Sequence, residues 1–119
     1  MDSTSKSNTI NHLIIGASRG IGRALVDLSV SAGHQVYALS RSVPENKPDS
    51  CKWITASATE PDTYLDSLPE TIHALTFCPG KVILGPIKRL KPEQMLEAYQ
   101  TSVLDAFTAV QGLLPRLDG

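Results

Sequence analysis

The chain has 119 residues, of which 41% are hydrophobic, and its 11 basic and 12 acidic residues give a formal net charge of -1. This length suits one globular domain, and the balanced charge argues against binding to nucleic acid or to an anionic membrane. The first nine residues lack the apolar core of a signal peptide, and no apolar run approaches the roughly 20 residues of a membrane span. We therefore expect a cytoplasmic protein.

Cysteine and histidine show no metal-ligand or disulfide pattern. The only cysteines, Cys51 and Cys78, are not in C-x-x-C spacing, and the three histidines lie at strand entries without a partner at ligand spacing. The sequence therefore predicts two reduced thiols and no metal site.

The first half of the chain alternates short apolar runs with one helical pattern. Residues 12–16 form an apolar run that ends in glycine, which is typical of a strand buried on both faces of a parallel sheet. Apolar residues then recur at helical spacing up to Gly33 and predict a helix of about three to four turns. Residues 34–40 and 52–56 predict two more strands, separated by an exposed loop at 42–50.

The second half adds a fourth strand between two helical segments. Residues 61–68 begin with a proline and are followed by another, which predicts a short helix. Residues 72–78 predict the strand, and 79–91 a partly buried loop. A long helix is predicted over 92–114, with one apolar stripe at steps of three or four. The stripe consists of Leu96, Tyr99, Val103, Phe107, Val110 and Leu114.

Strands that alternate with helices through short connections form βαβ units. We therefore predict an α/β fold with a doubly wound parallel sheet of about four strands and helices on both faces. Residues 1–10 are expected to be a disordered tail, and the ordered domain is expected to occupy 11–119.

Three glycines, Gly16, Gly20 and Gly22, lie where the first helix begins. Glycine in a helix costs about 1 kcal/mol relative to alanine, so something other than helix stability favours it here. In a doubly wound sheet this turn is the usual phosphate site, because the free N–H groups and the helix dipole favour negative charge. A tight turn without a ligand is the alternative, but the flanking strand and helix favour a nucleotide.

The turn reads Ile15-Gly16-Ala17-Ser18-Arg19-Gly20-Ile21-Gly22 and resembles the T-G-x-x-x-G-I-G turn of the short-chain dehydrogenase/reductase family. GPI at 85–87, the long helix and LLPRL at 113–117 are also similar to that family. The resemblance spans nearly all of the chain after the tail, but only the first half of a typical family domain. It implies that 11–119 is the N-terminal portion of an NAD(P)-binding Rossmann domain. The implied cofactor-binding residues of the turn are Gly16, Ser18, Arg19, Gly20, Ile21 and Gly22.

The end of the second predicted strand favours NADP over NAD. NAD-binding turns place an acid there for the ribose 2′-OH, whereas the 2′-phosphate of NADP needs cations. This chain has Ser40 and then Arg41, and Arg19 lies in the glycine turn, where NADP-preferring members of the family often have a basic residue. Each arginine alone could be a solvated surface charge. Together, and without the acid, they predict NADP.

Other positions depart from the family's pattern. Ser57, which precedes Ala58, replaces the Asp that contacts adenine, and the N-N-A-G after the fourth strand is Phe77-Cys78-Pro79-Gly80. The Asn of the long helix aligns with Ser102, to which we assign no catalytic role. The resemblance nevertheless implies five further residues of the predicted cofactor site. They are Ser57, Ala58, Cys78, Pro79 and Gly80.

No catalytic residue is assigned in this chain. The family's chemistry uses a Ser and a Y-x-x-x-K pair, but none of Tyr37, Tyr64 and Tyr99 has a lysine four residues later. We therefore expect the 119-residue chain alone to be inactive, with the catalytic half of the family domain absent from it.

The resemblance implies an NADP(H)-dependent oxidoreductase that transfers hydride between nicotinamide and a carbonyl or alcohol substrate. A non-catalytic nucleotide-binding sensor or regulatory protein is the alternative, and an interaction module whose glycines form only a turn is a third hypothesis. The family also implies a homo-oligomer through the helix at 92–114. Packing of that helix onto its own sheet is the other interpretation.

Overall fold

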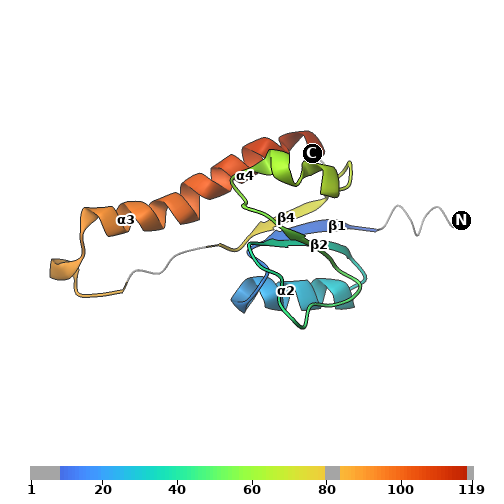
Figure 1. The fold of residues 1–119 in the computed structure, drawn as a ribbon, viewed down its shortest axis with the longest axis horizontal. Coiled ribbons are helices and arrows are strands. Elements are labelled where there is room, and N and C mark those ends of the chain that lie inside the picture. Colours follow the sequence, from blue (N-terminus) through green and yellow to red (C-terminus); the bar gives the residue numbers. More distant parts are fainter. Residues whose placement is uncertain (1–8, 80–83, 118–119) are drawn as a thin grey trace, which may run out of the picture.

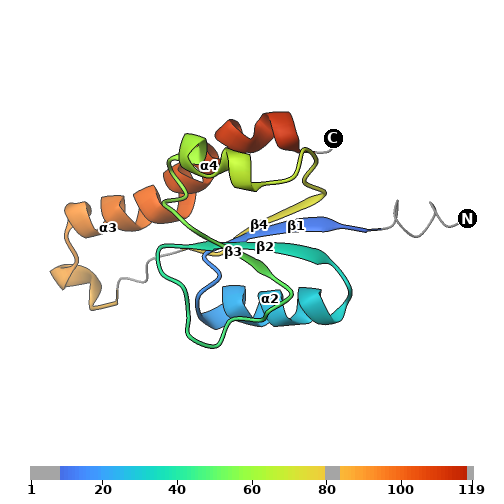
Figure 2. The same ribbon diagram turned by 45° about the vertical axis from the view of Figure 1, so that its right-hand side comes forward.

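Four parallel strands form the sheet. The computed structural model describes residues 9–79 and 84–117, so most of the predicted tail lies outside it. The strands are β1 (Asn11–Ile15), β2 (Gln35–Ser40), β3 (Lys52–Thr55) and β4 (Ala74–Phe77), in the order β3-β2-β1-β4. Figure 1 labels β1, β2 and β4, and Figure 2 also labels β3. Because Ile15 pairs with both Leu39 and Phe77, the carboxyl ends of β1, β2 and β4 meet at one edge. The predicted doubly wound fold is confirmed.

Helix α2 (Gly20–Ser31) covers one face of the sheet (Figure 2). It ends just before the predicted stop at Gly33, whose φ is +86° and whose amide donates to the carbonyl of Val30 at 3.0 Å. Glycine adopts this left-handed conformation without a Cβ penalty, and the chain then enters β2 directly. The core on this face consists of Ile14, Ala17, Val26, Val36, Ala38 and Cys51.

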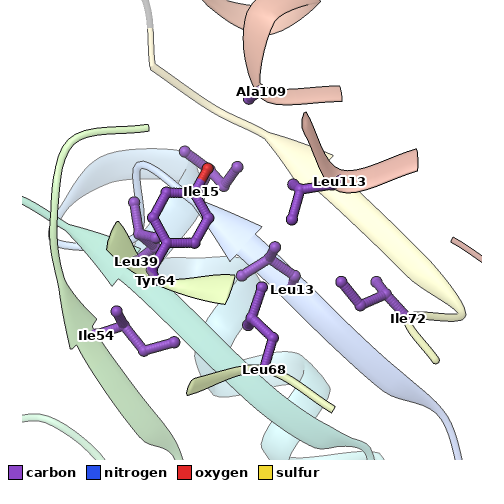
Figure 3. Close-up of a cluster of buried hydrophobic side chains, with 9 residues drawn as sticks. All are labelled: Leu13, Ile15, Leu39, Ile54, Tyr64, Leu68, Ile72, Ala109 and Leu113. Carbon is purple, nitrogen blue, oxygen red and sulfur yellow. The ribbon is translucent and has the colours of Figure 1, made fainter. Parts of the chain in front are cut away.

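The opposite face is covered by residues 61–68 and by the end of the chain. Figure 3 shows the ring of Tyr64 beside Leu39 and Ile15, with Leu113 packed against the sheet from above. All four side chains are almost completely buried. The full cluster consists of Leu13, Ile15, Leu39, Ile54, Tyr64, Leu68, Ile72, Ala109 and Leu113.

The short helix predicted over 61–68 is wrong in type. The segment forms two 3₁₀ turns, η1 (Pro61–Thr63) and η2 (Leu65–Ser67), separated by Tyr64 with a φ of -129°. This break points the Tyr64 ring into the core, and its hydroxyl donates to the carbonyl of Ala58 at 2.8 Å. Burying an aromatic ring removes about 150–250 Å² from water, which outweighs the weak helical propensity of a short segment.

The helix predicted over 92–114 begins at Pro92 but is not regular. It consists of α3 (Pro92–Tyr99), a π-helical turn η4 (Gln100–Leu104), α4 (Asp105–Leu113) and a final 3₁₀ turn η5 (Leu114–Arg116). The side-chain amide of Gln100 donates to Asp105 Oδ1 at 2.9 Å across the π turn. Apolar residues at steps of three or four do not distinguish a π turn from an α-helix, so the pattern could not predict this insertion.

The apolar stripe of this helix lies mostly in solvent. Leu96 is 66% exposed and Phe107 63%, whereas Ala109 and Leu113 are the buried residues of α4. Figure 1 shows α3 extending beyond the end of the sheet, and none of its residues is buried. The helix therefore packs onto the chain's own sheet only through α4, by Ala109 and Leu113, and the residues of the stripe do not take part. Within the described ranges, no helix is long and apolar enough to cross a membrane.

A polar cluster is buried where β1 begins. His12 is only 7% exposed, and its ring lies between Thr76 of β4, at 2.8 Å from Nε2, and Ser29 of α2, at 3.2 Å from Nδ1. The ring of His34 lies 6.1 Å away. Burial lowers the pKa of His12, and the neighbouring charge of His34 lowers it further. The fold therefore favours the neutral form of His12.

We predict that this histidine makes stability depend on pH. The unfolded chain takes up a proton as pH falls through 6.5, the ordinary pKa, but the folded chain resists it. The free energy of unfolding should therefore fall as pH is lowered from 7 to 5, by at most about 1.4 kcal/mol per pH unit for one proton. Urea titrations at several pH values measure this, and His12→Gln should flatten the curve. Equal slopes for the two proteins would contradict the assignment.

Candidate functional site

A cleft of about 1040 Å³ lies at the carboxyl edge of the sheet. Its walls come from the glycine turn, the ends of β2 and β4, the residues after β3, and two positions on the long helix. Among the residues that line it are twelve of the thirteen predicted above to bind a cofactor. They are Gly16, Ser18, Arg19, Gly20, Ile21, Gly22, Ser40, Arg41, Ser57, Ala58, Cys78 and Pro79. Gly80 lies outside the described residues, and binding itself remains a prediction.

Two of the three glycines are required by the chain's own packing. A Cβ on Gly22 would collide with the carbonyl of Gly16, and a Cβ on Gly16 would lie 2.7 Å from the nitrogen of Pro79. The amides of Gly16 and Ala17 both donate to the carbonyl of Leu39, at 2.9 and 3.3 Å. These contacts hold the start of α2 close to the strand ends, so internal packing explains Gly16 and Gly22 without a ligand.

Gly20 is different, because it faces open space. A Cβ there would meet no atom within 4 Å, and only its φ of +63° favours glycine. The first backbone hydrogen bond of α2 runs from Arg23 to the carbonyl of Arg19 at 3.4 Å, so the amides of Gly20, Ile21 and Gly22 precede the helical ladder. Arg19 caps the helix with no side-chain bond, and the first turn holds no acidic residue. This arrangement is a suitable anion site.

We predict that the two kinds of glycine respond differently to alanine. Gly22→Ala forces backbone apart and should lower the free energy of unfolding by about 3 kcal/mol or more. Gly20→Ala places a side chain on a residue with a left-handed φ but causes no collision, so it should lower the free energy of unfolding by only about 1–2 kcal/mol. Thermal and urea unfolding of the two variants measure the difference. A Gly22→Ala variant as stable as Gly20→Ala would show that the turn is looser than described.

Two arginines line the cleft with their charges unpaired. Across residues 9–79 and 84–117, neither the Arg19 nor the Arg41 side chain has a hydrogen bond or an ion pair, and both residues are exposed. By contrast, Arg23 bonds Asp27 and Asn46, and Arg116 donates to three carbonyls. Among the described residues of the lining, the only other charged one is Asp105. The cleft therefore carries an excess of positive charge.

Two serines of the lining, Ser40 and Ser57, have side-chain hydrogen bonds within the protein. Ser57 Oγ lies 3.0 Å from Thr59 Oγ1. The Ser40 hydroxyl donates to the carbonyl of Ser42 and accepts from Trp53 Nε1 at 2.9 Å. Ser40 therefore has no proton left to donate to a ligand, although its oxygen can still accept.

Several residues of the cleft were not found from the sequence. Thr101 and Asp105 reach it from the π turn and the start of α4. They stand four apart on the long helix, but only the position of that helix over the sheet edge shows that they belong to the site. The remaining lining residues that were not predicted are Ile15, Leu39, Ser42, Pro44, Ala56, Thr59 and Phe77.

The thiols and the buried tyrosine are not arranged for acid–base or nucleophilic chemistry. Burial raises the pKa of both Cys51 and Cys78, which keeps these thiols protonated at neutral pH. Burial also raises the pKa of Tyr64 to about 12. In the part of the chain that the structure describes, no group of three or more His, Cys, Asp or Glu residues could hold a metal ion. The two thiols and the Tyr64 hydroxyl are therefore all protonated at neutral pH.

Comparison with solved structures places this arrangement among known folds. A short chain dehydrogenase family protein from Francisella tularensis is 23% identical, with a TM-score of 0.77 over 92% of this chain and 47% of that one. The chain has the fold of the N-terminal half of a short-chain dehydrogenase. It spans about half the length of the structures that it matches. No family model and no curated protein sequence matches the chain.

Two further short-chain dehydrogenase-like structures contain dinucleotides. A short chain dehydrogenase from Leptospira borgpetersenii with bound NAD⁺ is 23% identical, with a TM-score of 0.70 over 87% of this chain and 44% of that one. A Burkholderia multivorans protein with bound NADP is 18% identical, with a TM-score of 0.74 over 92% of this chain and 55% of that one. At these identities the comparison shows the short-chain dehydrogenase fold alone.

Proposed function

We propose that this chain is the dinucleotide-binding half of an NADP(H)-dependent oxidoreductase of the short-chain dehydrogenase/reductase type. Such an enzyme transfers hydride between nicotinamide and a carbonyl or alcohol carbon. The observation that carries the proposal is the cleft, where the open amides of the glycine turn and two unpaired arginines converge at the carboxyl edge of the sheet. Similar structures hold NAD⁺ or NADP, which supports this class of cofactor.

Each part of the ligand has a suitable part of the cleft. The pyrophosphate fits the first turn of α2, because Gly20 leaves that approach open and the helix dipole favours negative charge. Arg41 follows β2, where a 2′-phosphate needs a cation, and Arg19 lies across the same cleft. The remaining predicted residues of the cleft lining are Ser57, Ala58, Cys78 and Pro79. The volume is that of a large ligand site.

We predict that the two arginines select NADPH. Arg19→Ala combined with Arg41→Asp removes charge-assisted hydrogen bonds worth about 1.5–3 kcal/mol and should weaken NADPH binding by about 10- to 150-fold. NADH affinity should change less than about threefold, since NADH lacks the 2′-phosphate. Isothermal titration calorimetry measures both constants.

The matched control is Arg89→Asp. Arg89 is an exposed arginine of the 3₁₀ turn at Ile87–Arg89 and does not line the cleft, so the same reversal of charge should leave both affinities unchanged. If the double variant loses NADH and NADPH equally, the preference for NADP is wrong. If the native chain binds neither dinucleotide, the proposed function itself is wrong.

A non-catalytic nucleotide sensor is the second candidate. It is favoured by Phe77 and Cys78, which line the cleft and replace the two asparagines of the family's N-N-A-G pattern. Both candidates bind NADPH, and we expect the chain by itself to transfer no hydride. The reading frame after the Gly119 codon distinguishes them, because a Ser followed by Y-x-x-x-K supports the enzyme.

We also propose that the exposed stripe of the long helix mediates self-association. Phe107 is 63% exposed and Tyr99 51%, in line with Leu96 and Val103. Analytical ultracentrifugation at tens of micromolar should show dimers or larger species, and Phe107→Glu should reduce them at least about tenfold in association constant. Gln111→Glu, an equal change of charge at an exposed polar position of the same helix, is the control. A monomeric native chain would contradict the proposal.

A further inference from the structure

The turn that carries Arg41 is held by a relay of two hydrogen bonds from β3. Trp53 Nε1 donates to Ser40 Oγ at 2.9 Å, and the same hydroxyl donates its proton to the carbonyl of Ser42. Ser40 is only 7% exposed, so both bonds lie largely out of water. Arg41 is the residue enclosed between the two ends of the second bond.

The relay is anchored on rigid structure. Trp53 lies in β3, pairs with Ala38 of β2 and packs against the core under α2. The backbone on both sides of Ser40 is also fixed, because the Ala56 amide donates to the Ser40 carbonyl at 3.1 Å and the Leu39 carbonyl accepts two amides of the glycine turn. The last residue of β2 is therefore restrained by its backbone and by its side chain.

The far end of the same segment is fastened independently. Arg23 of α2 donates to the side-chain oxygen of Asn46 at 3.1 Å and to its carbonyl at 2.7 Å. Arg41 is exposed between these two anchors and has no partner in the described part of the chain. The guanidinium of Arg41 is therefore unpaired within the described residues, while the backbone on either side of Arg41 is restrained by hydrogen bonds.

We propose that Trp53 is a positioning residue for the 2′-phosphate subsite. By holding Ser40, and through it the carbonyl of Ser42, the indole N–H gives the Arg41 turn one shape, so less conformational entropy is lost when Arg41 meets a phosphate. Trp53 acts through Ser40 and does not line the cleft. The inference rests on the proposed function, because it concerns the residue that increases the preference of the proposed cofactor site for NADPH over NADH.

Trp53→Phe is the test, because it keeps a large aromatic ring in place and removes the only N–H donor of the side chain. NADPH affinity should fall roughly three- to tenfold, the usual effect of one hydrogen bond, and NADH affinity should stay within about twofold. Ser40→Ala should have the same effect. The double variant should lose no more than either single variant, because both act through one relay.

The matched control is Ser29→Ala. It also removes one buried hydroxyl bond, to His12 at 3.2 Å, but at the other end of α2. It should lower the melting temperature and leave both dinucleotide affinities unchanged. This separates positioning from general loss of stability.

A spectroscopic readout is available because Trp53 is the only tryptophan. NADP⁺ should change its emission more than NAD⁺ does, and Ser40→Ala should abolish the difference between the two ligands. If Trp53→Phe leaves NADPH affinity unchanged, or reduces NADH affinity equally, the positioning role is overturned while NADPH binding by the native chain still stands. Failure of the native chain to bind either dinucleotide would instead overturn the proposed function.

Discussion

The contact between the start of α2 and the strand ends is the constraint on which the site depends. Gly22 lies so close to the carbonyl of Gly16 that no side chain fits between them, and the carbonyl of Leu39 accepts two amides from the same turn. Together these contacts join β1, β2 and α2 at one point. Because the helix begins there, its unpaired amides and the positive end of its dipole face the carboxyl edge of the sheet. The cleft follows from that placement.

Polar side chains at the two ends of the sheet differ in whether they have hydrogen-bond partners. At the amino end, His12 is buried and both of its ring nitrogens have partners, Thr76 and Ser29, as buried polar groups require. At the carboxyl end, Arg19 and Arg41 remain solvated and have no partner within the described residues. A buried polar cluster whose groups are all hydrogen-bonded stabilises the fold. Unpaired cations around a cleft attract an anion.

The sequence predicted the elements whose pattern is local. The apolar run before Gly16 and the stop at Gly33 are properties of neighbouring residues, and both are found where expected. The 3₁₀ turns around Tyr64 were missed because the tyrosine ring is drawn into a core formed by distant strands. The π turn at Gln100–Leu104 was missed because helical spacing does not distinguish it from an α-helix.

The site was predictable to the same extent. The glycine turn and the strand ends are read from short motifs, so their residues could be named before the cleft was seen. The bond between Trp53 and Ser40 depends on the register of β3 against β2, and the sequence does not give that register. Nor could spacing separate the roles of the glycines, since only the packed structure shows that Gly22 meets backbone while Gly20 faces open space.

The fold and the side chains of the cleft therefore bear on two different properties, the class of ligand and the choice between similar ligands. Structures of 18% and 23% identity share its fold, and one of them holds NADP while the other holds NAD⁺. The common fold therefore does not by itself distinguish NAD⁺ from NADP as a ligand. That choice depends on the few residues after β2, where an acid would repel the 2′-phosphate and a held, unpaired arginine attracts it. In the proposed function this choice depends on Arg41, and the turn that carries Arg41 is hydrogen-bonded through Ser40 to Trp53, a residue of a different strand.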